Sequence, residues 1–287
     1  MAVDRRKGWS TDRPEASGLV VATHNLMHGL RIDALVPHYL ALRETAGLDL
    51  LFLQEDRYLA GGPPGDERPS ARIAAALGSP YQLVRDDGCP GLCLIYDSRT
   101  LSCRARAVVP LPRLARLSWF EKLYIVGGQT KQKYVLLAEM QPDGGGPVFG
   151  AVCFHLDTAG GNAHRLTQVQ AIASALEARD LQRRAIVCGD TNAFVWRRQP
   201  EALGKLLAPL RDLGAADSET PETRPTHFFA RQNEPKLPHR TGVLLGKMGL
   251  DLPRRYDVVC TTLPVSRRGQ VVTPDSDHDL IWAELRV

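Results

Sequence analysis

The chain has 287 residues, of which 44% are hydrophobic and 24% are charged, and its formal net charge is +4 at pH 7. This composition excludes extensive disorder, and the apolar stretches are too short to span a bilayer. Residues 1–17 are basic but lack the apolar segment of a secretory signal, so they are expected to form a flexible leader. Six cysteines without such a signal favour reduced thiols and a cytoplasmic location.

Short apolar runs separated by glycine, proline and aspartate predict strands along the chain. In order, these are residues 19–23, 48–53, 81–84, 92–96, 102–109, 134–140, 148–154, 185–188, 256–261 and 280–285. Helical periodicity predicts helices over residues 33–45, 69–77, 163–179 and 200–207. The pattern predicts an α/β (α+β) fold with helix-covered sheets in one domain, residues 18–287. Residues 111–133 and 217–254 are expected to be long functional loops.

Chemically competent polar residues cluster at the ends of the predicted strands. Six strand ends supply, in chain order, Asn25, Glu55, His155, Asp190 with Asn192, Asp257, and Asp277 with His278. A single acid at the end of a strand is usually a cap or turn former. Acids, amides and imidazoles at six separate strand ends are not expected from turn formation alone. We therefore predict that they line a single polar cleft at one edge of the sheets.

The order of these residues resembles the endonuclease/exonuclease/phosphatase superfamily, which has the deoxyribonuclease I-like fold. The matching motifs are THN at 23–25, QE at 54–55, HL at 155–156, GDTN at 189–192, YD at 256–257 and SDH at 276–278. They extend over nearly the whole chain. The resemblance implies a four-layer sandwich, in which two packed mixed β-sheets are flanked by helices. It also implies a metal-dependent phosphoric ester hydrolase.

The expected cofactor is Mg²⁺, for which Mn²⁺ is a possible substitute. Such hard cations prefer oxygen ligands, usually one or two carboxylates completed by phosphate and water. By the resemblance, Glu55 is the first metal ligand, Asn25 supplies an amide oxygen and Asp277 contributes further. Met27 stands where the apurinic endonucleases carry an acid, so one accessory metal contact is absent and abasic-site cleavage is disfavoured.

The catalytic residues implied by the resemblance are five. Asp190 is expected to orient or deprotonate the attacking water, and Asn192 to hold that water and a phosphate oxygen. His155 and His278 are expected to donate to the developing charge and to transfer protons. Asp257 is expected to pair with His278 and fix its tautomer, as the acid does in a hydrolase triad.

Substrate binding is predicted at Trp196, Arg197 and Arg198, which directly follow the GDTN motif. These side chains are suited to stacking on a base and clamping a phosphate, although a helix start with solvated arginines would show the same residues. Residues 111–133 interleave basic and aromatic side chains, which suits nucleic acid or a phosphorylated head group but is also typical of a solvated face.

We therefore expect a phosphodiesterase or nuclease that acts on DNA or RNA by attack of water on phosphorus. One alternative is a phosphatase or phospholipase acting on a sugar-, inositol- or lipid-phosphate. A non-catalytic binding module is the other, and the competent side chains at all six motifs disfavour it. No obligate protein partner and no transmembrane segment are expected.

Residues outside the motifs receive structural interpretations. His24, His38, His164, His227 and His239 are expected to be structural or on the surface. His28 is grouped with them, although THNLMHG resembles a first motif that many bacterial members carry. Arg165 and Gln168 follow the HL motif with the R-x-x-Q spacing of the superfamily, and we expect them to anchor a helix to the sheet.

Overall fold

The structure is a computed structural model, which describes residues 18–58, 68–124, 130–193, 199–218, 224–228, 231, 244 and 254–287. The predicted leader, residues 1–17, lies outside the described residues. The strands are β1 (Leu19–Asn25), β2 (Leu48–Asp56), β3 (Tyr81–Val84), β4 (Gly91–Asp97), β5 (Leu101–Pro110), β6 (Tyr134–Pro142), β7 (Phe149–His155), β8 (Ala185–Asp190), β9 (Ala216–Asp217), β10 (Asp257–Thr261), β11 (Val265–Val271) and β12 (Leu280–Leu285). The helices are the 3₁₀ turn η1 (Met27–Gly29), α1 (Ile32–Ala46), α2 (Pro69–Leu77), α3 (Trp119–Tyr124), α4 (Gly161–Glu177), α5 (Gln199–Leu206) and α6 (Ala208–Asp212).

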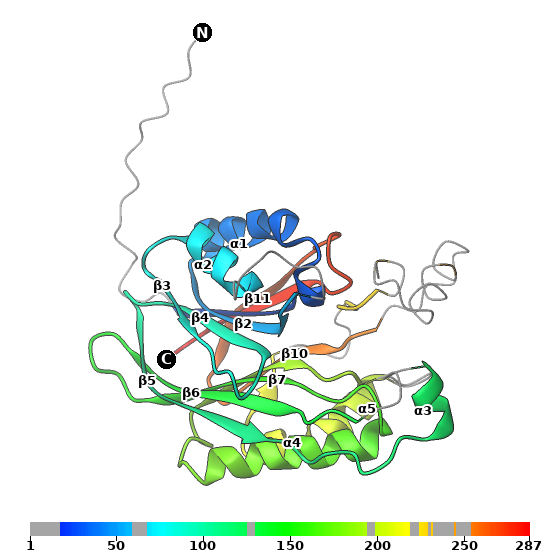
Figure 1. Cartoon of the computed structure of the whole chain (residues 1–287). Helices are drawn as coiled ribbons and strands as arrows, with labels where there is room; N and C mark the ends of the chain where they lie inside the picture. Colours follow the sequence, from blue (N-terminus) through cyan, green and yellow to red (C-terminus); the bar gives the residue numbers. More distant parts are fainter. Residues whose placement is uncertain are drawn as a thin grey trace.

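The described strands form two six-stranded mixed sheets. The first has the order β11-β12-β1-β2-β4-β3, and the second has the order β5-β6-β7-β8-β10-β9. Within them, β1 pairs with β2 and β7 with β8 in parallel, whereas the other pairs are antiparallel. Helices α1 and α2 lie outside the first sheet, and α4 lies outside the second (Figure 1). The predicted α/β fold is confirmed.

Three apolar clusters separate four layers of secondary structure. The central cluster joins the inner faces of the two sheets and contains the fully buried rings of Phe52 and Phe149. A second cluster packs α4, α5 and α6 on the other sheet, with Leu176 and Val187 in it. The third packs α1 and α2 on the first sheet around Tyr39. Each fully buried side chain of this kind contributes roughly 1.5–3 kcal/mol, and the predicted sandwich is confirmed.

Local sequence signals set where the helices begin and end. Helix α1 ends at Gly47, whose left-handed backbone (φ 77°) accommodates the turn into β2. Helix α2 begins at Pro69, whose ring fixes φ and whose missing N–H has no helical partner at that position. None of the helices in the described residues has both the length and the apolarity needed to cross a membrane.

The two parallel strand pairs place the motifs at one edge of the sandwich. In the first sheet Asn25 pairs with Gln54, the residue before Glu55. In the second sheet Asp190 pairs with His155 on one side and with Asp257 on the other. The SDH motif immediately precedes β12, which runs antiparallel to β1. Strands of both orientations therefore deliver side chains to the same edge.

Candidate active site

The carboxylate of Asp190 is the meeting point of the two sheets. Its Oδ2 accepts a hydrogen bond from Nδ2 of Asn25 at 3.1 Å. The same oxygen lies 3.8 Å from Nε2 of His155 and 3.7 Å from Nε2 of His278. Its Oδ1 accepts the backbone N–H of Asn192 at 2.8 Å. Four of the predicted site residues, Asn25, His155, His278 and Asn192, thus surround the buried carboxylate of Asp190.

Gly189 explains how β8 brings Asp190 so close to β7. A Cβ atom at position 189 would lie 2.0 Å from the carbonyl oxygen of Phe154, well inside van der Waals contact. A side chain would therefore push β8 away from β7 at the pair formed by His155 and Asp190. The glycine of the GDTN motif is required by this close approach of two backbones.

His278 is held on both of its sides. Its Nδ1 lies 2.8 Å from Oδ2 of Asp257, a fully buried residue at the start of β10. Its backbone N–H donates to Oγ of Ser276, and that hydroxyl donates to the carbonyl oxygen of Asn25. The SDH motif is therefore tied both to the end of β1 and to β10. Its imidazole is oriented with Nε2 toward Asp190.

Burial and neighbouring charges set the protonation states at this edge. Burial alone lowers the pKa of His278, but the carboxylates of Asp257, Asp277 and Asp190 together outweigh it and raise that pKa well above 6.5. Burial raises the pKa of Asp257 against the effect of His278, and we place the shared proton on the imidazole because it faces several carboxylates. Burial alone raises the pKa of Asp190, and the two imidazoles together with the hydrogen bonds from Asn192 and Asn25 reverse this to a net lowering. Burial lowers the pKa of His155 to about 3, so His155 is neutral.

Glu55 offers a carboxylate beside the amide of Asn25. Its Oε2 lies 3.4 Å from Nε2 of His28, and its side chain is 20% exposed, which leaves it accessible to ions. Asn25 is fixed next to it, since its Oδ1 accepts the backbone N–H of Met27 at 3.0 Å. Carboxylate and amide oxygens are the donors that Mg²⁺ prefers. The donor set at the ends of β1 and β2 therefore fits the implied cation.

Backbone strain is concentrated at the same edge. Among the described residues, the non-glycine residues with positive φ are Met27, His28, Glu55, Asp180 and Asn192. All of these except Asp180 lie in or next to the motifs. Such conformations cost about 1–3 kcal/mol each and persist only where surrounding contacts impose them. The contacts of the site residues with their neighbours supply that constraint.

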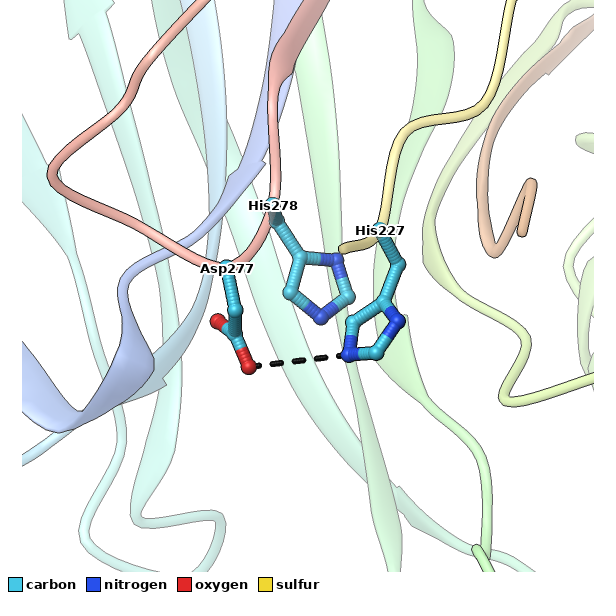
Figure 2. A group of neighbouring side chains, drawn as sticks. All are labelled: His227, Asp277 and His278. Atoms are coloured by element: carbon cyan, nitrogen blue, oxygen red, sulfur yellow. Dashed lines mark ion pairs between the residues drawn. The ribbon is translucent and has the colours of Figure 1, made fainter. Parts of the chain in front are cut away.

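His28 and His227, which were expected to be structural or on the surface, are both buried and lie beside the predicted site residues. His28 faces Glu55 from η1. Nε2 of His227 lies 3.6 Å from Oδ2 of Asp277, and its ring meets the ring of His278 edge-on (Figure 2). The position of His28 three residues after the THN motif was a usable signal. No sequence pattern marks His227.

Lys133 is a further residue that the motifs do not single out. It directly precedes β6, whose pairing with β7 places it beside the end of the strand that carries His155. Its ammonium group interacts with the carboxylates of Asp157, Glu55 and Asp190, although burial lowers its pKa overall. A positive charge at this position faces the ends of both parallel strand pairs.

The loop after β7 is anchored as predicted. Nε of Arg165 donates to the carbonyl oxygen of Asp157, and Nε2 of Gln168 donates to its carboxylate. Asn192 joins the same loop, because its Nδ2 donates to the carbonyl oxygen of Leu156 at 3.0 Å. The role of Arg165 and Gln168 as helix-to-sheet anchors is confirmed. The predicted contact of Asn192 with water and phosphate stays a prediction.

The predicted substrate-binding residues Trp196, Arg197 and Arg198 lie outside the described residues. So does most of the predicted loop 217–254. In the other predicted loop, residues 111–133, the structure describes a short helix, α3, whose Trp119 is 78% exposed. The carboxylate of Glu121 in α3 accepts the N–H of Gly160, which joins this helix to the start of α4.

Comparison with models of protein families and with curated protein sequences finds no match. Solved structures, however, have a similar fold. One is an endonuclease/exonuclease/phosphatase from Bacteroides vulgatus, 17% identical over 94% of this chain and 99% of that chain, with a TM-score of 0.63. D. rerio TDP2, complexed with a single-stranded DNA product, is 14% identical over 94% of this chain and 100% of that chain, with a TM-score of 0.62. A mannosyl-6-phosphatase from Bacteroides thetaiotaomicron is 15% identical over 93% of this chain and 99% of that chain, with a TM-score of 0.58.

Each of these similarities covers almost the full length of both compared chains. They agree with the order of strands and motifs described above. At identities of this level they establish the architecture and leave the reaction to the side chains. The chain therefore has the fold of the endonuclease/exonuclease/phosphatase proteins.

Proposed function

We propose that the chain is a metal-dependent phosphoric ester hydrolase that acts on phosphodiesters of nucleic acid. The observation that carries this proposal is the buried array in which His278 lies between the carboxylates of Asp257 and Asp190, with His155 on the same oxygen of Asp190. An anionic base, a cationic acid and a neutral donor around one point are what hydrolysis of a phosphate ester needs.

Glu55 and Asn25 would hold the divalent cation, with Asp277 contributing a further oxygen. When bound, the cation polarises the phosphoryl group and neutralises charge that develops on it. Lys133 places a further positive charge near the carboxylates of this edge and is suited to a phosphate oxygen. These residues bind and orient the ester and do not themselves transfer protons.

The proton transfers are assigned from the protonation states. Asp190 is ionised and accepts a proton from the water whose oxygen attacks phosphorus. His278 is protonated and gives its Nε2 proton to the leaving ester oxygen as the P–O bond breaks. Because Nε2 of His278 lies 3.7 Å from Asp190, the proton on Asp190 returns to the imidazole across this short gap. Neutral His155 donates to a non-bridging oxygen.

Nucleic acid is the substrate class that we favour. The similar fold of TDP2 is recorded with a single-stranded DNA product. The segment 111–133 carries an exposed tryptophan among basic residues, a combination suited to stacking on bases and contacting phosphates. The second candidate is a sugar phosphatase, which the likeness to a mannosyl-6-phosphatase supports. Both candidates use the same core, and the substrate would be selected by the surrounding loops.

A substrate panel tests the proposal. The chain is incubated with Mg²⁺ or Mn²⁺ and single- or double-stranded DNA, RNA, phosphotyrosyl DNA, bis-(p-nitrophenyl) phosphate, inositol phosphates and sugar monophosphates. Hydrolysis of the diester and of nucleic acid is expected, with both lost in Asp190→Asn. Turnover of sugar monophosphates without cleavage of nucleic acid at low salt would instead establish the phosphatase. No hydrolysis of any ester would contradict the proposal.

A salt titration separates the substrate-binding residues from the catalytic ones. Binding of single-stranded DNA should weaken with salt, and Arg197→Ala or Arg198→Ala should reduce the slope of log K against log [salt] by roughly one unit each. The same variants should still hydrolyse bis-(p-nitrophenyl) phosphate. His155→Ala should lose on the order of 10²–10⁴ in rate on every substrate.

A further inference from the structure

Three potential metal ligands, one of which is His278, lie close together. His227, Asp277 and His278 each offer one ligand atom, and these atoms lie within 4.8 Å of one another. In Figure 2 the carboxylate of Asp277 and the rings of the two histidines turn toward a common space. His227 is 3% exposed, Asp277 8% and His278 4%, so the cluster is buried and is not a set of surface acids.

The surroundings hold the ring of His227 in place before any ligand arrives. It stacks on Tyr256 with ring centroids 4.7 Å apart and an interplanar angle of 30°. Its backbone exchanges hydrogen bonds with Arg254 at 2.7 and 3.0 Å. His278 is oriented independently, through Nδ1 and Asp257. Two imidazoles from separate segments are therefore fixed at one place.

The donor set of this cluster differs from that of Glu55 and Asn25. Two imidazole nitrogens and one carboxylate suit zinc and other borderline ions, whereas Mg²⁺ prefers an all-oxygen set. Three protein ligands of this kind leave a position for water, as in many zinc sites. The hydrogen bond from His278 to Asp257 is the outer-sphere carboxylate contact that metal-bound histidines usually have.

We propose that His227, Asp277 and His278 bind a zinc ion, and that this ion inhibits the enzyme by occupying His278. Nδ1 of His278 is already bonded to Asp257, so the ion would take Nε2 and release to solvent the proton that this nitrogen carries. The inhibition rests on the proposed function, in which the same Nε2 supplies a proton to the leaving group. Zinc would also withdraw Asp277 from the Mg²⁺ ligands. Whether zinc binds at this site can be tested without measuring any activity.

Direct metal binding is the first experiment, using the full chain and Zn²⁺ or Co²⁺ alone as probes. Calorimetry should find one Zn²⁺ per chain that excess Mg²⁺ does not displace, and Co²⁺ should give a visible spectrum without thiolate-to-cobalt absorption. That absence matters because the chain has six free cysteines. His227→Phe retains a ring that can stack on Tyr256 but has no ligand atom. It should weaken Zn²⁺ binding by roughly 10–100-fold or more.

His164→Phe is the matched control, because His164 also faces a carboxylate, with Nε2 2.9 Å from Oδ2 of Asp157. No metal-binding group in the described residues includes that pair. The control should bind Zn²⁺ like the parent chain. His227→Gln is the second variant if the phenylalanine impairs folding, and it should also weaken binding. Unchanged affinity in a folded His227 variant, or a thiolate spectrum in the parent chain, would overturn the site.

The second experiment measures hydrolysis of bis-(p-nitrophenyl) phosphate with saturating Mg²⁺ and increasing Zn²⁺, each protein being normalised to its own rate in Mg²⁺ alone. Zinc should inhibit the parent chain, and the His227 variants should need at least roughly tenfold more of it. Equal inhibition of all proteins would overturn the regulatory role. If the parent chain binds Zn²⁺ at this site but hydrolyses nothing, the site is supported and the proposed function fails. If the parent chain hydrolyses the diester but binds no Zn²⁺, the proposed function is supported and the zinc site is wrong.

Discussion

His278 and Asp257 form the shortest link between the two sheets at the site, with Nδ1 2.8 Å from Oδ2. His278 comes from the loop before β12 of one sheet, and Asp257 begins β10 of the other. The contact fixes the tautomer of the imidazole, so that Nε2 faces Asp190. A residue that touches no substrate in this arrangement therefore determines whether the acid is correctly presented.

Asp257→Asn should lower kcat by about 10²–10⁴ with a much smaller effect on KM, because the amide does not hold a protonated imidazole. Steady-state kinetics on bis-(p-nitrophenyl) phosphate would measure this. Asp97→Asn is the control, since Asp97 is also buried and paired, with Arg99, but lies at the far end of β4. Equal losses in both variants would mean that only folding had been affected.

Glu55→Gln should raise the Mg²⁺ concentration for half-maximal rate by roughly tenfold or more and lower kcat by about 10², because one carboxylate charge is lost from an all-oxygen set. Glu44→Gln on α1 serves as a control, as its carboxylate is 58% exposed and paired only with Arg43 in the described contacts. Excess EDTA should abolish the activity of the parent chain. Full turnover in EDTA would end the metal-dependent interpretation.

The fold was largely predictable because its signals are local. Continuous apolar runs form buried strands, such as β1 in the first sheet and β8 in the second. The polar motifs lie at the ends of those runs. The predicted helices agree with α1, α2, α4 and α5 to within two residues. Turn chemistry such as Gly47 after α1 fixes these ends without reference to the rest of the chain.

What sequence reasoning missed depends on contacts between distant segments. His227 reaches the site through two isolated bridges, one to Arg254 and one to His278. Its neighbours in sequence give no periodic pattern, so nothing local marks it as part of the site. Lys133 is one of several basic residues in the segment 111–133, and nothing local distinguishes it, because its proximity to Glu55 and Asp190 arises from the packing of the two sheets.

Gly189→Ala should destabilise the fold by about 3 kcal/mol or more, because its Cβ would lie 2.0 Å from the carbonyl oxygen of Phe154. Displacement of β8 should also remove activity in any fraction that folds. Gly204→Ala in α5 is the matched control, because a Cβ there meets nothing within 4 Å. It should stabilise the helix by roughly 0.5–1 kcal/mol. Urea unfolding of both variants tests the contrast, and similar midpoints would contradict it.

The free energy of unfolding should fall between pH 7 and pH 5, and His24 and His155, the two buried histidines with lowered pKa, should both contribute to the fall. His24 is buried, with Nδ1 2.6 Å from Oη of Tyr39 and Nε2 3.1 Å from the carbonyl oxygen of His278. Burial lowers its pKa from 6.5 to about 4 in the folded chain. Between these values the unfolded chain binds a proton that the folded chain does not, so the contribution of His24 is complete above pH 6.5 and is lost as the pH falls toward 4.

At about 1.4 kcal/mol per pKa unit, protonation of His24 in the unfolded chain should remove roughly 2 kcal/mol of unfolding free energy by pH 5. His24→Gln keeps polar atoms at this position but has no group that titrates in this range. Its unfolding free energy should therefore be lower than that of the parent chain at pH 7, while its decrease from pH 7 to pH 5 should be smaller by that amount. Urea unfolding at the two pH values measures this decrease in the parent chain and in the variant. Equal decreases in the two proteins would show that His24 is protonated in the folded chain despite its burial.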